Sequence, residues 1–208
     1  MSALSTVTEK EIDHLRSMLS LRIGEQRFRH TLGVEETIAS LGELYLPNEV
    51  LRLRVAALLH DLTKEWTAEE QLSFCRKQNI PLSPEEIAAP KVLHAKTAAF
   101  LAERDYAALV DQEIVKAIRE HTVGAPDMSV FSALLYLADY IEPTRTYPEC
   151  VALRRAFYDE YSAKNKMCHL ARIMARALLA SIDEVKARGG VPLQESFDAL
   201  TFFQKFKG

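Results

Sequence analysis

Apolar residues recur at spacings of three and four along most of the chain, which places them on one face of an α-helix. Residues 25–44 show this amphipathic pattern throughout, and residues 55–59 form a short continuous apolar run. No stretch alternates convincingly between apolar and polar residues, as a half-buried strand would. With only 7 glycines to interrupt the helical segments, the pattern predicts an all-α fold.

Capping signals predict where these helices begin and end. Thr8 with Glu11, and Thr67 with Glu70, have the spacing of a capping box, in which side chains satisfy free backbone N–H groups. Gly189-Gly190 should end the last long helix. Cap residues predict a helix after Thr8 to about residue 23, one after Asn48 to His60, one after Thr67 to about residue 79 and a short one after Ser83. Asp111 should cap a helix at residues 112–121, and Ser129 one at residues 130–141. Further helices are expected at residues 25–44, 91–105, 148–161, 164–188 and about 195–205.

The length and continuity of the chain favour a single domain. With 208 residues it can bury roughly 70% of the surface that its unfolded form exposes. It contains no internal repeat, low-complexity segment or linker long enough to divide domains. We therefore expect one compact domain over residues 1–208.

Composition narrows the classes of partner and the compartment. The formal net charge is −3 and the pI is near 6.1, whereas general nucleic-acid binders rely on clustered Lys and Arg. No apolar stretch approaches the ~20 residues of a membrane helix, so neither nucleic acid nor membrane is an expected partner. The 3 cysteines form no C-x-x-C pair and residues 1–10 do not resemble a signal peptide, which favours the cytoplasm.

The strongest chemical signal is the pair His60-Asp61 at the end of the apolar run. An aliphatic helix gains nothing from ending in two potential metal ligands, so chemistry explains the pair better than packing does. Imidazole and carboxylate suit zinc, iron, manganese and similar ions, whereas a thiolate site needs cysteines at ligand spacing. Further candidate ligands, each on a predicted helix or at its end, are His30, His94, His121 and Asp139.

Helical geometry decides which candidates can cooperate. Arg27 and His30 are three residues apart and share a face. Neighbours on a helix diverge by about 100°, so His60 and Asp61 can address one metal only where the helix ends. Thr63 and Lys64, followed by the next cap, mark such an end.

Four strings of residues carry a resemblance to a known family. They are Arg-Phe-Arg-His at 27–30, His-Asp-Leu-Thr-Lys-Glu at 60–65, His-Thr-Val-Gly at 121–124 and Ala-Asp-Tyr-Ile-Glu-Pro-Thr-Arg at 138–145. They resemble the HD-domain phosphohydrolases and, more narrowly, the YqeK-type bacterial symmetrical bis(5'-nucleosyl)-tetraphosphatases. The resemblance spans about residues 15–185 and implies an all-helical HD fold with a metal site between helices.

The resemblance also implies two metal ions, usually described as iron, with manganese, cobalt and zinc left open. The residues allow this interpretation, because four imidazoles and two carboxylates exceed one tetrahedral centre but suffice for two metals if one carboxylate bridges. The expected ligands are His30, His60 and Asp139 for the first metal, His94 and His121 for the second, and Asp61 between them.

The implied reaction is symmetrical cleavage of diadenosine tetraphosphate, a small-molecule substrate, to two ADP. Metal-activated hydroxide would attack, since metal ions pull the pKa of bound water toward roughly 7. Asp61, Lys64 and Arg145 are expected to be catalytic, the two cations by stabilising phosphate charge. Residues expected to contact substrate are Arg27, Lys64, Thr122, Gly124, Tyr140 and Arg145. Metal identity, nucleobase preference and the choice between monomer and homodimer stay open.

Several of these residues have a structural alternative. Lys64 and Arg145 could be solvated surface charges. Arg27 could pair with Glu142, which could equally pair with Arg145. Thr122 and Gly124 could serve only to shape the turn after His121, Gly124 by allowing a positive φ. Residues expected to be structural, in the core or on the surface, are His14, Trp66, Phe74, Leu134, Leu135, Leu137 and His169.

Two other functions fit the same residues. One is an HD-domain nucleotide phosphatase or phosphodiesterase of different specificity. The other is a nucleotide-sensing or adaptor protein that retains metal but turns nothing over. An open two-metal centre with cations beside it favours the hydrolase, because a binding module does not need one.

Overall fold

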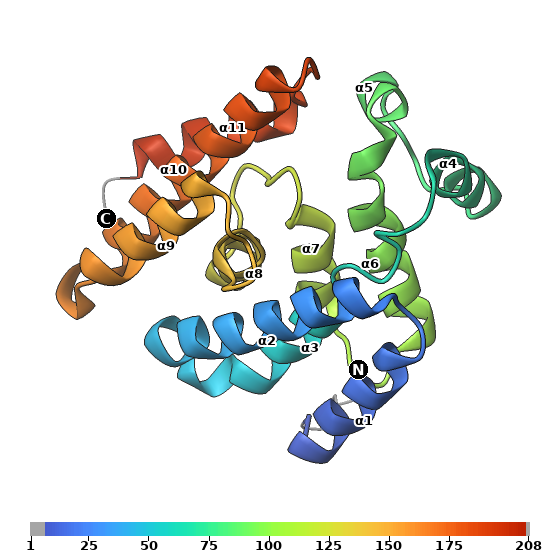
Figure 1. Ribbon diagram of the computed structural model, residues 1–208, viewed down its shortest axis with the longest axis horizontal. Coiled ribbons are helices and arrows are strands. Elements are labelled where there is room, and N and C mark those ends of the chain that lie inside the picture. Colours follow the sequence, from blue (N-terminus) through green and yellow to red (C-terminus); the bar gives the residue numbers. More distant parts are fainter. Residues whose placement is uncertain (1–6, 207–208) are drawn as a thin grey trace.

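The computed structural model describes residues 7–206, and within that range it is built from α-helices and short 3-10 turns without a β-strand (Figure 1). This confirms the predicted all-α fold class. The α-helices are α1 (Glu9–Ser20), α2 (Glu25–Tyr45), α3 (Val50–Leu59), α4 (Ala68–Lys77), α5 (Pro84–Ala88), α6 (His94–Asp105), α7 (Gln112–Glu120), α8 (Val130–Ile141), α9 (Pro148–Asp159), α10 (Lys166–Ala187) and α11 (Gln194–Lys205). The 3-10 turns are η1 (Pro47–Glu49), η2 (Pro90–Val92) and η3 (Ala163–Asn165).

Most helix starts agree with the capping signals. Thr8 and Thr67 each form a complete capping box, and the side chains of Ser83, Asp111 and Ser129 each accept backbone N–H groups of the helix that follows. Each of these caps supplies acceptors for N–H groups that have no partner within the helix.

Three predicted helix starts are wrong, each at a 3-10 turn, and two of these turns begin with proline. Asn48 lies inside η1 and caps nothing, so α3 begins at Val50 with Glu49 in the cap position. Likewise, α6 begins at His94 rather than Lys91, because η2 occupies residues 90–92. The third is α10, which begins at Lys166 rather than Lys164, because η3 occupies residues 163–165. Smaller differences end α1 at Ser20, α4 at Lys77, α9 at Asp159 and α10 at Ala187.

The core forms around α8, which is seen end-on near the centre of Figure 1. Helices α2, α7, α9 and α10 pack against it, and α3 packs between α2 and α7. Leu134, Leu135 and Leu137 of α8 are fully buried, as predicted, while Trp66 and Phe74 pack edge-to-face against each other at the margin of the core. The surface of α8 is therefore mostly apolar and buried, and a polar side chain on this helix needs a specific partner.

The C-terminal helix α11 docks along α10 and buries Ala199 and Phe203. Ser196 of α11 also donates a hydrogen bond to the backbone oxygen of Val123, at 2.8 Å, in the turn after α7. This helix therefore supports the turn that follows His121. No helix in the described part of the chain is long and apolar enough to cross a membrane.

The chain leaves the helical path immediately after α3, where residues 60–65 form consecutive turns. Buried hydrogen bonds hold this segment. The Thr63 hydroxyl donates to the backbone oxygen of His94 at 3.1 Å, and the Gln71 side chain donates to the backbone oxygen of Thr63 at 2.7 Å. The turn that carries His60 and Asp61 is thus tied to α4 and to the start of α6.

Candidate metal centre and active site

The structure brings the six predicted ligand residues into one cluster. They come from the second turn of α2, the end of α3, the start of α6, the end of α7 and the last turn of α8. Four of them come from helix termini, where the backbone turns. The cluster consists of His30, His60, Asp61, His94, His121 and Asp139, all buried except the partly buried Asp139.

Three of the imidazoles are fixed in one tautomer by the backbone. In each, Nδ1 lies close to the carbonyl oxygen three residues earlier: 2.6 Å for His60, 2.7 Å for His94 and 2.6 Å for His121. A carbonyl can only accept, so Nδ1 carries the hydrogen in each neutral ring. The unprotonated Nε2 is then left to face the cluster, which is the form a metal requires.

His30 is oriented by a side chain instead. Its Nδ1 lies 3.0 Å from Oε1 of the fully buried Glu142. Glu142 also accepts hydrogen bonds from the backbone N–H and the hydroxyl of Thr144. Although burial opposes ionisation, these bonds lower the pKa of Glu142. Burial alone would lower the pKa of His30, but hydrogen bonds to Asp139 and Glu142 raise it to about 9.

Asp61 lies between two sets of imidazoles. Its Oδ2 is 3.3 Å from Nε2 of His60 and 3.7 Å from Nε2 of His30. Its Oδ1 is 3.4 Å from Nε2 of His94 and 3.5 Å from Nε2 of His121. Each carboxylate oxygen therefore addresses a different pair of histidines.

This donor set fits metal ions. Nε2 of His60 and Oδ1 of Asp61 are buried with no hydrogen-bond partner among the described residues. Such atoms are costly to bury unless something binds them. The ligand atoms of His30, His60 and Asp139 all lie within 4.8 Å of one another, as do those of His60, Asp61 and His121. Imidazole nitrogen with carboxylate oxygen suits zinc, iron and manganese.

Three cationic side chains contact the cluster directly. Arg27 lies 2.7 Å from Oδ2 of Asp61, and Arg145 lies 2.6 Å from Oδ1 of Asp139. Against the effect of burial, the charge of Arg145 helps to hold the pKa of Asp139 well below its usual range. The pKa of Asp61 is also well below its usual range, because His60 and Lys64 favour its ionised form more than burial disfavours it.

Lys64 contacts the other side of the cluster. Its Nζ lies 2.9 Å from Nε2 of His94, and burial together with this charge lowers the pKa of that imidazole. His94 is thus held neutral. The predicted cations therefore face the candidate ligands, and none of them is a fully solvated surface charge.

Three other residues were expected to contact substrate, namely Thr122, Gly124 and Tyr140, and they lie in different surroundings. The Thr122 hydroxyl lies 2.9 Å from Nε2 of His94 and 3.1 Å from Nε2 of His121. Gly124 has a φ of +74° and is enclosed by side chains of α10, α11 and Met128, not by the cluster. The buried Tyr140 hydroxyl has no hydrogen-bond partner in the described chain, and burial raises its pKa. Only Thr122 of these three contacts candidate ligands.

Two residues that support the site were not predicted as site residues: Glu65, which only ends one of the four resembling strings, and Arg154, which lies outside them. Glu65 accepts a hydrogen bond from the backbone N–H of Gly24 at 2.8 Å, joining the turn after α3 to the start of α2. Arg154 donates to the backbone oxygens of Ile141 and Arg145. Both contacts depend on which segments pack together, and that cannot be read from spacing along the chain.

The remaining predicted structural histidines lie outside the cluster. His14 is exposed on α1, and the buried His169 on α10 pairs with the hydroxyl of Tyr45 at 2.7 Å.

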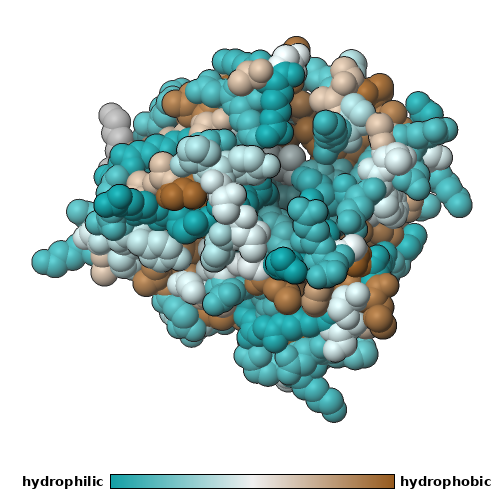
Figure 2. Space-filling view, viewed as in Figure 1, coloured by the Kyte–Doolittle hydropathy of each residue, from teal (hydrophilic) through white to brown (hydrophobic). Residues whose placement is uncertain are grey.

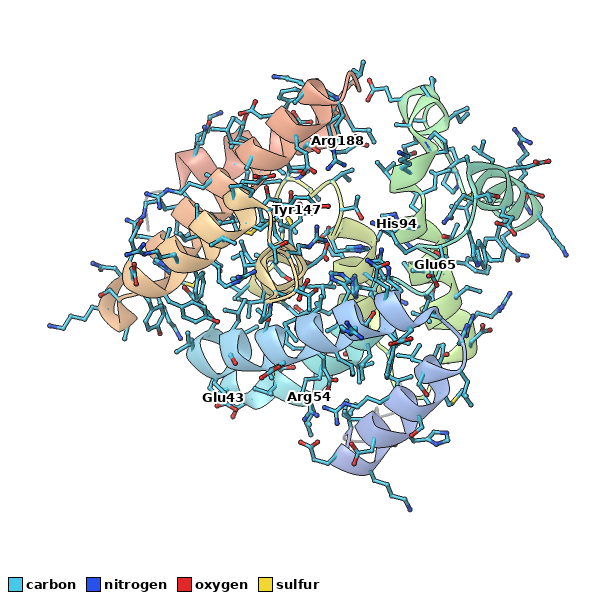
Figure 3. All side chains as sticks on the ribbon, viewed as in Figure 1. Glu43, Arg54, Glu65, His94, Tyr147 and Arg188 are labelled. Carbon is cyan, nitrogen blue, oxygen red and sulfur yellow. The ribbon has the colours of Figure 1, made fainter. Side chains whose placement is uncertain are left out.

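On the face of the molecule drawn in Figure 2, hydrophilic residues border much of a central hollow. Figure 3 labels His94 and Tyr147 on either side of α7 in the same view.

The sequence of this chain is similar to those of known proteins. A family model described as "HD domain" matches residues 27–144. The protein "Bis(5'-nucleosyl)-tetraphosphatase, symmetrical" of Halalkalibacterium halodurans is 36% identical over 126 residues, which are 60% of this chain and 65% of that relative. The chain thus spans just under two thirds of that relative. The protein of the same name from Bacillus subtilis is 33% identical over 134 residues, 64% of this chain and 70% of that one.

A solved structure shares the fold over nearly the whole chain. It is a "predicted HD superfamily hydrolase involved in NAD metabolism" from Clostridium acetobutylicum, 28% identical, with a TM-score of 0.78. The similarity covers 92% of this chain and 96% of that one. The likeness therefore extends well beyond residues 27–144, which the family model matches.

Proposed function

The chain belongs to the HD-domain family, and on this basis we propose that it is a metal-dependent symmetrical bis(5'-nucleosyl)-tetraphosphatase that hydrolyses diadenosine tetraphosphate to two ADP. The observation that carries the proposal is the position of Asp61, each of whose oxygens faces a different pair of histidines. Such a carboxylate is suited to be shared by two metal ions. The names of the similar proteins supply the substrate.

The candidate ligands divide into two sets around Asp61. His30, His60 and Asp139 would hold one ion, and His94 and His121 the other. Bound there, two metal ions would activate water and neutralise charge on the attacking and leaving oxygens. Iron is the metal we propose, with manganese, cobalt and zinc as alternatives that the same donors accept.

The chain's own cations would position the polyphosphate. Lys64 and Arg145 contact opposite ends of the ligand cluster, through His94 and Asp139. Each side chain is partly exposed, so each can exchange its present partner for a phosphate oxygen. Arg145 can bind such an oxygen through a planar fork, while Lys64 acts as a point charge. Arg27 and the Thr122 hydroxyl are further donors at the edge of the cluster.

Symmetrical cleavage requires attack at either inner phosphorus of the tetraphosphate, which leaves ADP on both sides. Charge on the departing ADP must be neutralised as its bridging oxygen separates, and preorganised cations perform this at no cost of reorganisation. Lys64, Arg27 and Arg145 meet that need in the buried cluster. We place the protein in the cytoplasm, with the dinucleotide as its partner.

The product pattern tests this proposal. Metal-loaded protein incubated with diadenosine tetraphosphate should release ADP as the sole nucleotide product, resolved by chromatography. AMP with ATP would reject symmetrical cleavage. Absence of turnover with iron, manganese, cobalt and zinc, combined with tight nucleotide binding, would instead identify a nucleotide-sensing protein. Turnover of mononucleotides alone would identify another HD-domain phosphatase.

A further inference from the structure

Tyr147 is an aromatic side chain left exposed close to a candidate phosphate-binding residue. It lies two residues after Arg145 and is 55% exposed. Its hydroxyl makes no hydrogen bond within the part of the chain that the structure describes, and it supplies no side-chain cap to α9. The role of Tyr147 is therefore neither to fill the core nor to begin the helix.

The backbone around Tyr147 is held in place. Pro148 follows it, which restricts Tyr147 to extended conformations, and its φ and ψ are −61° and 138°. The guanidinium of Arg154 donates hydrogen bonds to the backbone oxygens of Ile141, Glu142 and Arg145, at 2.5, 2.5 and 2.8 Å. Because the backbone of this loop is already fixed, binding a ligand to the exposed ring would cost little further backbone conformational entropy.

The place of Tyr147 in the chain, just after Arg145, suits contact with the part of a nucleotide beyond its phosphates. Arg145 reaches back to Asp139 in the metal cluster, while Tyr147 lies farther along the same loop. Two residues of chain span at most roughly 7 Å, a reach that suits the sugar and phosphate that join a base to a terminal phosphate. Figure 3 labels Tyr147 on the opposite side of α7 from His94.

We propose that Tyr147 is the surface on which one nucleobase of the dinucleotide stacks while Arg145 holds the adjoining phosphate. The inference rests on the proposed function and deepens it by assigning a base subsite. A tyrosine ring suits this role because every base offers a π-face, so stacking contributes affinity without a hydrogen-bonding code. It also supplies what metals and phosphate contacts lack, a preference for nucleotides over inorganic polyphosphate.

The same exposed ring could instead serve self-association, since Val151, one turn later on α9, is also exposed. With Tyr158 in the last turn of the same helix, these are three exposed side chains, a small patch well short of the area that a stable interface buries. The nucleotide is therefore the better occupant, and the oligomeric state becomes one readout of the test.

Tyr158 provides a matched control. It is 49% exposed and lies in the last turn of the same helix, roughly 16 Å farther along the helix axis from Tyr147 at 1.5 Å per residue. The experiment measures binding of ADP and of inorganic pyrophosphate to metal-loaded protein by calorimetry. The proteins compared are the wild type, Tyr147→Ala, Tyr147→Phe and Tyr158→Ala.

Tyr147→Ala should weaken ADP binding by about 5- to 150-fold, the range expected for loss of one stacked base. Pyrophosphate affinity should be unchanged, and Tyr147→Phe and Tyr158→Ala should bind ADP as the wild type does. Unchanged ADP affinity in Tyr147→Ala overturns the inference, and so does an equal loss of ADP and pyrophosphate binding, which would mean that the loop itself is disrupted. A changed sedimentation coefficient with normal ADP binding would overturn it in favour of self-association.

These outcomes are independent of turnover. If the wild type fails to cleave diadenosine tetraphosphate while Tyr147→Ala still loses ADP affinity selectively, the proposed reaction fails and the base subsite stands. If the wild type produces ADP and Tyr147→Ala binds ADP normally, only the base subsite fails.

Discussion

Gly33 lies directly against the carboxylate of Glu142, so that a Cβ on Gly33 would come within 2.5 Å of Oε2. The other oxygen of that carboxylate is the partner of His30 Nδ1, at 3.0 Å. His30 and Gly33 are three residues apart on α2 and share a face. One helix thus carries the imidazole and also leaves the space that its carboxylate partner occupies.

Gly33→Ala should therefore damage the metal centre without unfolding the protein. Alanine favours a helix by up to about 1 kcal/mol over glycine, but its methyl group would displace Glu142 and release His30. Loss of such a supporting carboxylate typically lowers metal affinity by about 10- to 100-fold. Metal titration followed by elemental analysis measures this effect, and circular dichroism verifies the helix content.

Gly42→Ala is the control, because it makes the same change on the same helix. Its Cβ would meet the buried Leu53 and the partly buried Val50, away from the candidate ligands. It should alter thermal stability and leave metal affinity as in the wild type. Equal metal affinity in Gly33→Ala and the wild type would show that Glu142 does not need this space.

Metal stoichiometry should distinguish Asp61 from His94. Asp61 faces both sets of histidines, so Asp61→Ala should lose most of the metal and nearly all activity. His94 faces only one set, so His94→Ala should retain about half the metal and lose activity mainly in kcat. Elemental analysis of purified variants measures the ratio. Full metal content in Asp61→Ala would refute the shared position, and unchanged metal with normal rates in His94→Ala would indicate a one-metal site.

Removal of the phosphate-facing cations should impair the reaction and spare the metals. A charge-assisted hydrogen bond contributes about 1.5 to 3 kcal/mol, so Lys64→Ala or Arg145→Ala should lower kcat/KM by roughly 10- to 150-fold. A change confined to KM would mean that the cation binds ground state and transition state equally, whereas a fall in kcat would mean that it meets developing charge.

Arg155→Ala is the control for this charge change, because the Arg155 side chain is 83% exposed and, within the part of the chain that the structure describes, pairs only with Asp159 on its own helix. It should leave the kinetics unchanged. If Lys64→Ala and Arg145→Ala also behave as the wild type at low salt, where exposed charges act most strongly, neither residue binds phosphate.

Local signals predicted most helices because the groups that interact are close in sequence. Thr8 and Thr67 satisfy N–H groups within the next turn, and their capping boxes form as the spacing required. Asn48 had the right residue type for a cap, but Pro47 starts a 3-10 turn that contains Asn48. Residue type alone does not show whether a cap residue stands at the first helical turn or within a preceding one.

The sequence predicted which residues make up the candidate site, but not the contacts that hold those residues in position. His60 and Asp61 stood out because their chemistry conflicts with the apolar helix before them, and the family resemblance added the distant histidines. The tautomers of His60 and His121 follow from helix-end geometry, which places a carbonyl three residues earlier beside Nδ1. The close approach of Gly33 to Glu142 depends instead on how α2 packs beside the end of α8, which no local pattern encodes.

Acid stability should depend on His169, which lies away from the metal centre. It is buried beside Tyr45, and burial, together with the charge of Arg172, lowers its pKa. The unfolded chain then binds a proton at this residue before the folded one does. The stability that neutral His169 contributes is present above its unfolded pKa, about 6.5, and is lost as the pH falls toward the lowered folded pKa.

His169→Gln should therefore flatten the decline of unfolding free energy between pH 8 and pH 5. Where only the unfolded state is protonated, one such group contributes a slope of up to about 1.4 kcal/mol per pH unit. Urea unfolding of metal-free protein at a series of pH values measures the slope, with metal excluded so that its release does not add to it. His14→Gln is the control, since exposed His14 should leave the slope as in the wild type. If both variants retain the wild-type slope, the buried imidazole of His169 does not limit stability in acid, and the carboxylates and histidines elsewhere in the fold account for the decline.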